Sequence, residues 1–141
     1  MEFDNKDERP MKKLNETVEL SRYDLRNEKE YVEELAGTLM ALNITPMYKG
    51  FNYIIDAIRI LNRNRYTHLL ITKDIYIPVA DLYETTPELV EHGMRTAIKR
   101  GWQKTKDRKY KEKIFPSIDK CPSNYAFLVI VSNYVGERIK G

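Results

Sequence analysis

Apolar side chains recur every three or four residues along much of this chain, which is the spacing of an amphipathic helix. Asparagine, proline and glycine residues fall between the periodic stretches, where they would end one helix and form a turn. The pattern predicts helices over residues 28–42, 51–62, 68–71, 74–83 and 87–103.

The stretch 87–103 carries a strong helix-start signal. Thr86 is a favourable N-cap residue, and Pro87 suits the first helical position because its missing N–H would have no partner there. Gly93 lies inside the stretch and lowers helix stability by up to ~1 kcal/mol relative to alanine. We therefore expect that Gly93 allows a close approach by the preceding helix.

The run from Tyr125 to Val131 is uniformly apolar and rich in residues that favour strands. The sequence contains no second run of this kind to pair with it, and a lone strand would leave its backbone groups unsatisfied. Since Pro122 and Ser123 signal a helix start, we predict a buried final helix over residues 123–138. The predicted fold is all-α, a compact bundle of about six helices.

Residues 1–27 are polar and contain Pro10 and charges of both signs, without a sustained apolar period. We expect a flexible N-terminal arm with a short helix around Val18 to Leu25, followed by one folded domain over residues 28–141. The acidic start of the sequence has no apolar stretch, so no secretory signal is expected.

Composition narrows the class of protein. With 141 residues, of which 42% are hydrophobic, the chain can build one core. Its longest apolar run is seven residues, far below the ~20 that span a bilayer. The single cysteine, Cys121, excludes an internal disulfide and a multi-cysteine zinc site and favours a cytoplasmic protein.

The sequence shows no grouping of residues that is typical of an enzyme. His68 and His92 lack metal-ligand spacing to each other or to Cys121, and the glycines do not form a phosphate-binding loop. We therefore expect no catalysis, no cofactor and no metal.

The net charge of +3 conceals an uneven distribution. Residues 1–35 carry −4, residues 36–91 carry −1, residues 92–113 carry +7 and residues 114–141 carry +1. A basic block on an otherwise near-neutral chain is typical of a protein that binds a polyanion, although a solvated lysine-rich face has the same composition.

Two of the predicted helices, 74–83 and 87–103, are joined by a turn of three or four residues, as in a helix-turn-helix. Such a unit needs a small residue where its helices cross. Ala80 fits that position, and Val90 follows ten residues later on the second helix. Glu84 stands where the turn often contains glycine. An ordinary αα-hairpin within a helical bundle would give the same pattern.

Several segments between Leu39 and Val135 match one known family in order and spacing, with little or no gap. They are Ile44–Tyr53 with Asp56-Ala57-Ile58, Ile71-Thr72-Lys73 with Tyr76 and Ala80, Thr85-Thr86 with Val90-Glu91 and Ala97-Ile98 to Trp102, and Pro122-Ser123-Asn124 with Phe127. The first of these is similar to the family motif Val-Pro-Ala-His-Ile-Lys-Gly-Tyr-x-Tyr. On these segments the chain resembles the C-terminal DNA-binding effector domain of the sporulation master response regulator.

The resemblance implies an all-helical domain that binds promoter DNA through the helix after Thr86. This chain keeps only Glu91 of the family's base-reading positions and has Leu89 and His92 where the family has arginines. Because an arginine paired with guanine contributes ~1–3 kcal/mol of discrimination, we expect an altered operator preference. The family's receiver domain has no counterpart in this sequence, so control by aspartyl phosphorylation within this chain is not expected.

The charge block and the resemblance together give a set of candidate DNA contacts. Arg95 and Lys99 would contact phosphates or the groove, Glu91 would accept a hydrogen bond from cytosine, and Leu89 would touch a thymine methyl group or a partner protein. The tract after the helix would contact the DNA backbone or form a surface loop. The full set is Thr86, Glu88, Leu89, Glu91, His92, Arg95, Lys99, Lys104 and Lys106.

The leading hypothesis is a sequence-specific DNA-binding transcription regulator whose helix at 87–102 enters the major groove of double-stranded DNA. Homodimeric or tandem binding is expected, because one small module rarely supplies enough affinity. The alternative is a protein-interaction module that binds a regulator, polymerase or other transcription or sporulation factor, which the loss of two arginines would suit. No membrane partner is expected.

Overall fold

The structure, a computed structural model, describes residues 28–64 and 68–140, and these residues form helices without any strand. A helix covers residues 28–41. It is followed by α2 (Lys49–Arg63), η2 (Ile71–Tyr76, a π-helical stretch), α3 (Ile77–Leu82), α4 (Pro87–Lys104), α5 (Arg108–Ile114) and α6 (Asn124–Lys140). The all-α prediction is confirmed, and α2, α4 and α6 agree with their predicted ranges within two residues at each end. The predicted arm at residues 1–27 lies outside the described residues.

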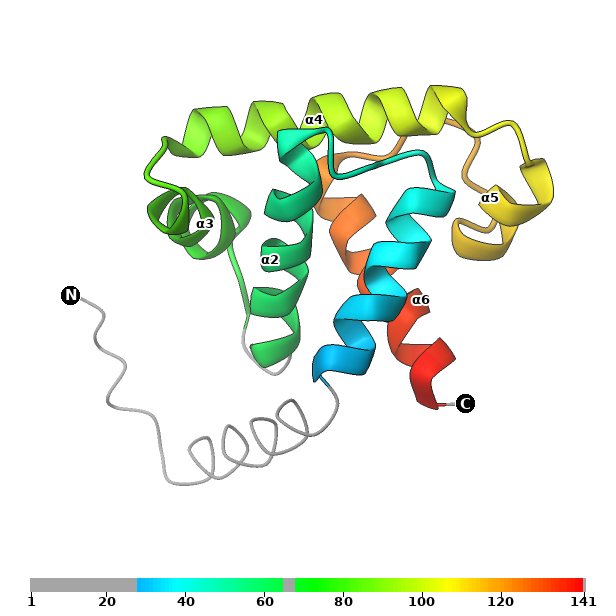
Figure 1. Ribbon diagram of the computed structural model, residues 1–141, viewed down its shortest axis with the longest axis horizontal. Coiled ribbons are helices and arrows are strands. Elements are labelled where there is room, and N and C mark those ends of the chain that lie inside the picture. The colour runs from blue at the N-terminus through cyan, green and yellow to red at the C-terminus, as the bar shows by residue number, and fades with distance from the viewer. Residues whose placement is uncertain (1–27, 65–67, 141) are drawn as a thin grey trace.

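Helix α4 lies across one end of the bundle (Figure 1). The helix at 28–41, α2 and α6 run away from it, while α3 lies near its N-terminal end and α5 beyond its C-terminal end. The core between these helices contains fully buried Leu35, Ile54, Met94 and Leu128, one from each of the four larger helices. Helix α4 therefore has one face in the core and presents the other to the outside.

Helices α2 and α4 cross at small residues. A Cβ atom at Gly50 would lie 2.4 Å from the Gly93 carbonyl oxygen and 2.8 Å from the Ala97 Cβ atom, whereas a Cβ atom at Gly93 would lie 3.0 Å from the Tyr53 ring. The close approach predicted at Gly93 is present, but the helix that makes it is α2 and not the preceding helix, α3. The glycine pattern indicates that space is needed and does not specify which helix fills it.

The helix at 28–41 is closed two residues later by Asn43, whose φ of 64° is left-handed. The Ile44 N–H donates to the Leu39 carbonyl at 2.9 Å, which is one bond of a Schellman motif. The Asn43 side-chain amide then donates to Thr105 Oγ1 at 3.0 Å. Helix 28–41 is therefore tied to the residue that follows α4.

Two parts of the helix prediction are wrong. Residues 68–70 are not helical, because Leu70 is extended (φ −104°, ψ 125°) and its N–H donates to the Asp74 carboxylate at 2.8 Å. Helix α5 was not predicted. Only Ile114 of its seven residues is buried, so it has no apolar period, and Asp107 caps it by accepting from the Tyr110 N–H at 3.1 Å.

Candidate nucleic-acid interface

The turn between α3 and α4 closes through backbone hydrogen bonds around Glu84. The Thr85 N–H donates to the Ala80 carbonyl at 3.0 Å, and Glu84 has a φ of 52°. This is the Schellman geometry in which glycine is the usual residue. Ala80 is 1% exposed and Val90 is fully buried, and α3 packs on α4. The helix-turn-helix prediction is thereby confirmed, with glutamate in the left-handed position.

The first turn of α4 is capped as predicted. Thr86 Oγ1 accepts a hydrogen bond from the Leu89 N–H at 3.1 Å, so the helix uses the oxygen of this predicted site residue. Beyond the cap, Glu88, Leu89 and His92 are exposed, and 56% of Leu89 is accessible. The first turns of the second helix are the part of a helix-turn-helix that meets base edges, so these side chains are available for that role.

Glu91 and Arg95 form an ion pair one turn apart on the outward side of α4. Arg95 Nε donates to Glu91 Oε2 at 2.9 Å and Arg95 Nη2 to Oε1 at 3.3 Å, while His92 Nδ1 lies 3.2 Å from the same Nη2. The hydrogen bond and charge of Arg95 lower the pKa of the Glu91 carboxyl below its usual value. The pair uses Arg95 Nε and Nη2 and both oxygens of Glu91, so it competes with a base or a phosphate for these groups.

Asn124, the first residue of α6, holds α4 from its inner side. Its amide nitrogen lies 3.1 Å from the Glu91 carbonyl oxygen and 2.9 Å from the Tyr76 hydroxyl oxygen, and donates to both. Asn124 is 8% exposed, so these bonds are shielded from competing water. One side chain therefore connects η2, α4 and α6 directly beneath the exposed residues of the helix-turn-helix.

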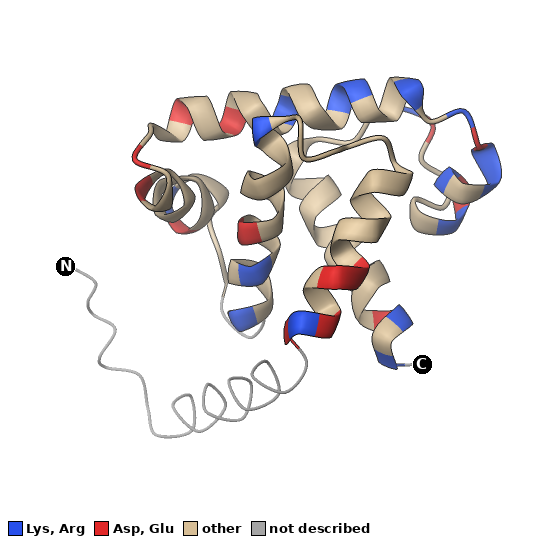
Figure 2. Ribbon diagram, viewed as in Figure 1, with Lys and Arg blue, Asp and Glu red and all other residues tan. Residues whose placement is uncertain are grey.

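Charge changes sign along α4. Figure 2 shows acidic residues towards the end of α4 that follows α3, and basic residues towards the end that leads to α5. The exposed acidic residues near the α3–α4 turn are Asp81, Glu84 and Glu88, and the exposed basic residues at the other end are Lys99, Arg100, Lys104, Lys106, Arg108 and Lys109. Of the predicted site residues, Thr86 caps α4 and Lys106 follows it, while those between them lie on α4, with Glu88 near its start and Lys104 at its end.

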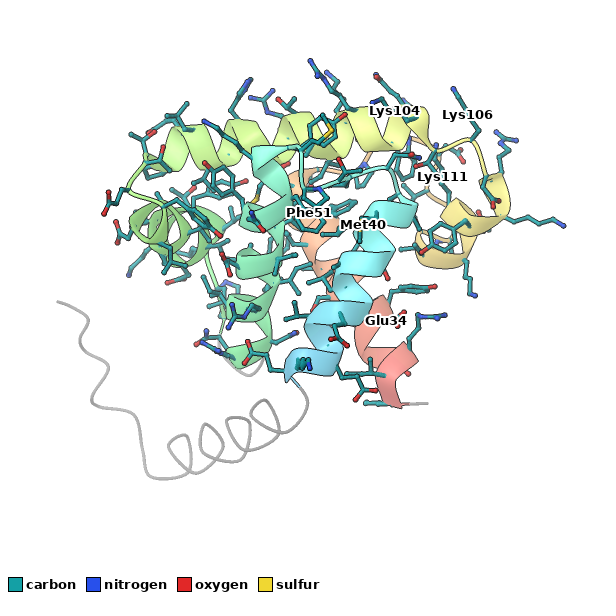
Figure 3. All side chains as sticks on the ribbon, in the orientation of Figure 1. Glu34, Met40, Phe51, Lys104, Lys106 and Lys111 are labelled. Carbon is teal, nitrogen blue, oxygen red and sulfur yellow. The ribbon has the colours of Figure 1, made fainter. Side chains whose placement is uncertain are left out.

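Lys104 and Lys106 lie at the C-terminal end of α4 and in the connection after it (Figure 3). Lys104 Nζ donates to the Tyr48 hydroxyl oxygen at 3.1 Å, and Lys111 Nζ lies 4.5 Å from the centroid of the Trp102 ring. Tyr48 was not among the predicted site residues. It stands in the turn before α2, 56 residues from Lys104, and no local pattern links two positions so far apart.

A buried small residue at a helix crossing, an exposed second helix and a basic surface beside it are typical of a helix-turn-helix protein of the DNA-binding class. Residues 35–135, more than two thirds of the chain, match the family described as sporulation initiation factor Spo0A C terminal. The chain belongs to this family, which comprises DNA-binding regulatory domains of sporulation and is not an enzyme family. The predicted resemblance is confirmed.

None of the helices in residues 28–64 and 68–140 is both long and apolar enough to cross a membrane. No three histidine, cysteine, aspartate or glutamate side chains in that part of the chain are grouped as a metal ion would require.

Proposed function

We propose that this chain is a sequence-specific DNA-binding transcription regulator whose helix α4 enters the major groove. The observation that carries the proposal is the row of exposed side chains at Leu89, His92, Arg95 and Lys99, in a chain of a DNA-binding family. Their spacing of three and four residues places them on one side of the helix. The working unit is the domain at 28–141, acting in the cytoplasm as a homodimer or in tandem on DNA.

Base recognition falls to the first half of α4. Leu89 offers methyl groups to the thymine methyl, and His92 offers a ring N–H to a base or a phosphate. Glu88 disfavours a close phosphate because both carry negative charge. With neither family arginine present, guanine is not read by a bidentate contact at these two positions, and the operator preference differs accordingly.

Phosphate neutralisation falls to the second half of α4 and the connection after it. Lys99, Lys104 and Lys106 are exposed, and among the described residues none of them forms an ion pair with a carboxylate. Arg95 also neutralises a phosphate when its ion pair with Glu91 opens. These contacts hold the domain on the duplex without reading sequence.

A salt-titrated binding assay on duplex DNA tests the proposal. Each neutralised phosphate contributes about 0.9 to the slope of log affinity against log salt, so the double variant Arg95→Ala/Lys99→Ala should flatten the slope by up to about 2. Lys140→Ala, at the exposed end of α6, removes one positive charge far from α4 and should leave the slope unchanged. Loss of all DNA retention at low salt in the unaltered protein would refute the proposal.

One observation favours a second candidate function, a protein-interaction module. Leu82 and Leu89, on either side of the α3–α4 turn, are 64% and 56% exposed, and acidic Glu84 and Glu88 stand beside them in the sequence. An apolar surface with acidic neighbours suits a partner protein with a basic rim. Capture of a transcription or sporulation factor that Leu89→Ser abolishes, without any DNA binding, would favour this function.

A further inference from the structure

The Tyr48 hydroxyl group accepts a hydrogen bond from a cation. Lys104 Nζ donates to its oxygen at 3.1 Å and lies 5.8 Å from the centre of its ring. The positive charge of Arg100, one turn earlier on α4, also lowers the pKa of this hydroxyl group. Among the described residues, neither Arg100 nor Lys104 forms an ion pair with a carboxylate. The turn before α2 and the end of α4 thus bring together two positive charges without a negative partner.

The direction of the hydrogen bond decides what this group can bind. A lysine ammonium only donates, so the phenol oxygen accepts from Lys104 and keeps its own hydrogen for another partner. No acceptor for that hydrogen is present in the part of the chain that the structure describes. The hydrogen bond from Lys104, followed by the charges of Lys104 and Arg100, lowers the pKa of the Tyr48 hydroxyl, which makes it a stronger donor.

We propose that Tyr48, Arg100 and Lys104 form a binding site for a phosphodiester group of the DNA backbone, with the Tyr48 hydroxyl as its neutral donor. The chemistry required is a compact oxyanion that accepts one O–H and two cationic N–H hydrogen bonds. The site lies at the exposed basic end of α4, which also carries Lys99. The family motif has isoleucine where this chain has Tyr48, so the hydroxyl belongs to this chain's own surface. This inference rests on the proposed DNA-binding function.

The test compares variants that separate the hydroxyl from the charge. Tyr48→Phe removes the donor and keeps both cations, so we expect Kd for duplex DNA to rise about fivefold to tenfold while the salt slope stays unchanged. Lys104→Ala removes a charge and should flatten the slope by about 0.9. Tyr134→Phe, on the part of α6 that runs away from α4, is the matched control and should bind as the unaltered protein does. Thermal unfolding of each variant confirms that the fold is kept.

The outcomes distinguish three cases. If the unaltered protein binds DNA and Tyr48→Phe binds equally well, the hydroxyl is not part of a phosphate site and this inference is wrong while the proposed function stands. In the second case, inorganic phosphate added at constant ionic strength shifts the NMR signals of Tyr48 and the shift saturates at millimolar concentration, while Tyr48→Phe leaves DNA affinity unchanged. The site then binds a free anion, and the inference is again wrong. If the unaltered protein retains no DNA at low salt, the proposed function fails and this inference fails with it.

Discussion

At the scale of single residues, Glu84 is the clearest departure from what its position favours. Its φ of 52° lies in the left-handed region, where a residue with a Cβ atom is strained by roughly 1–2 kcal/mol. Backbone hydrogen bonds from the turn to Ala80 and Asp81 hold it there. The turn geometry is therefore imposed by the packing of α3 on α4 and not by the preference of the residue in the turn.

Replacing this glutamate tests the strain. Glu84→Gly should raise the free energy of unfolding by about 0.5–1 kcal/mol, which is the relieved strain less the added freedom of glycine in the unfolded chain. Chemical denaturation measures the difference. Asp81→Gly removes the same charge from a helical position in α3 and should not stabilise the protein. Equal stability of the Glu84→Gly variant and the unaltered protein would show that the turn stores no strain.

At the scale of elements, the crossing of α2 and α4 fixes the position of the exposed helix. Gly50 and Gly93 let the two backbones approach so closely that a methyl group at Gly50 would overlap the Gly93 carbonyl group. Asn124 holds the same helix from α6 through the Glu91 carbonyl. Helix α4 is thus held by backbone contact on one side and by a buried amide on the other, which leaves its outward face free for a ligand.

A series of glycine-to-alanine variants measures the crossing. Gly50→Ala should lower the free energy of unfolding by about 2–3 kcal/mol, because the contact at 2.4 Å is with backbone that cannot rotate away. Gly93→Ala should cost less, since its nearest neighbour is the edge of the Tyr53 ring at 3.0 Å. Gly37→Ala has nothing within 4 Å and should stabilise its helix by up to ~1 kcal/mol. Similar losses for all three variants would contradict the close crossing.

The elements also show what local sequence signals can and cannot predict. Helices with an apolar period or a cap signal, such as α2 and α4, were placed within two residues. The sequence does not predict helix α5, because Ile114 is its only buried residue. Nor does it predict that η2 begins at Ile71, since this start depends on the hydrogen bond from the Leu70 N–H to the Asp74 carboxylate. At the candidate site, helical spacing predicts the exposed row of side chains on α4. It does not predict the contact between Tyr48 and Lys104, because that contact forms only when α2 and α4 pack together.

At the scale of the whole molecule, charge is separated along one axis. The acidic residues around the α3–α4 turn stand at one end of α4 and the basic block stands at the other (Figure 2). This order also suits the helix itself, since negative charge is favourable at a helix N-terminus and positive charge at its C-terminus. For DNA binding the same order is unfavourable at the acidic end. Glu88 and Glu91 lie in the half of α4 that should enter the groove, where they repel phosphates.

Removing one of these charges measures that conflict. Glu91→Gln should tighten binding to non-specific duplex about twofold to fivefold without changing the salt slope, because Arg95 then reaches the same phosphate without first leaving a carboxylate. Fluorescence anisotropy at several salt concentrations provides both numbers. Glu33→Gln, an exposed position on the helix at 28–41, removes the same charge elsewhere and should change neither. Weaker binding of Glu91→Gln to a selected operator would instead indicate that this carboxylate accepts a hydrogen bond from a base.

The separation of charge along α4 also determines how the protein would arrive at DNA. In the field of a duplex the basic end is attracted and the acidic end repelled before any atoms touch, so the molecule turns and leads with α5. We expect salt to act mainly on the association rate, while the lifetime of the complex depends on the contacts made later by the first half of α4. A uniformly basic helix would collide productively in more orientations. The separated charges of this chain would therefore favour one orientation of the domain in its first encounter with DNA.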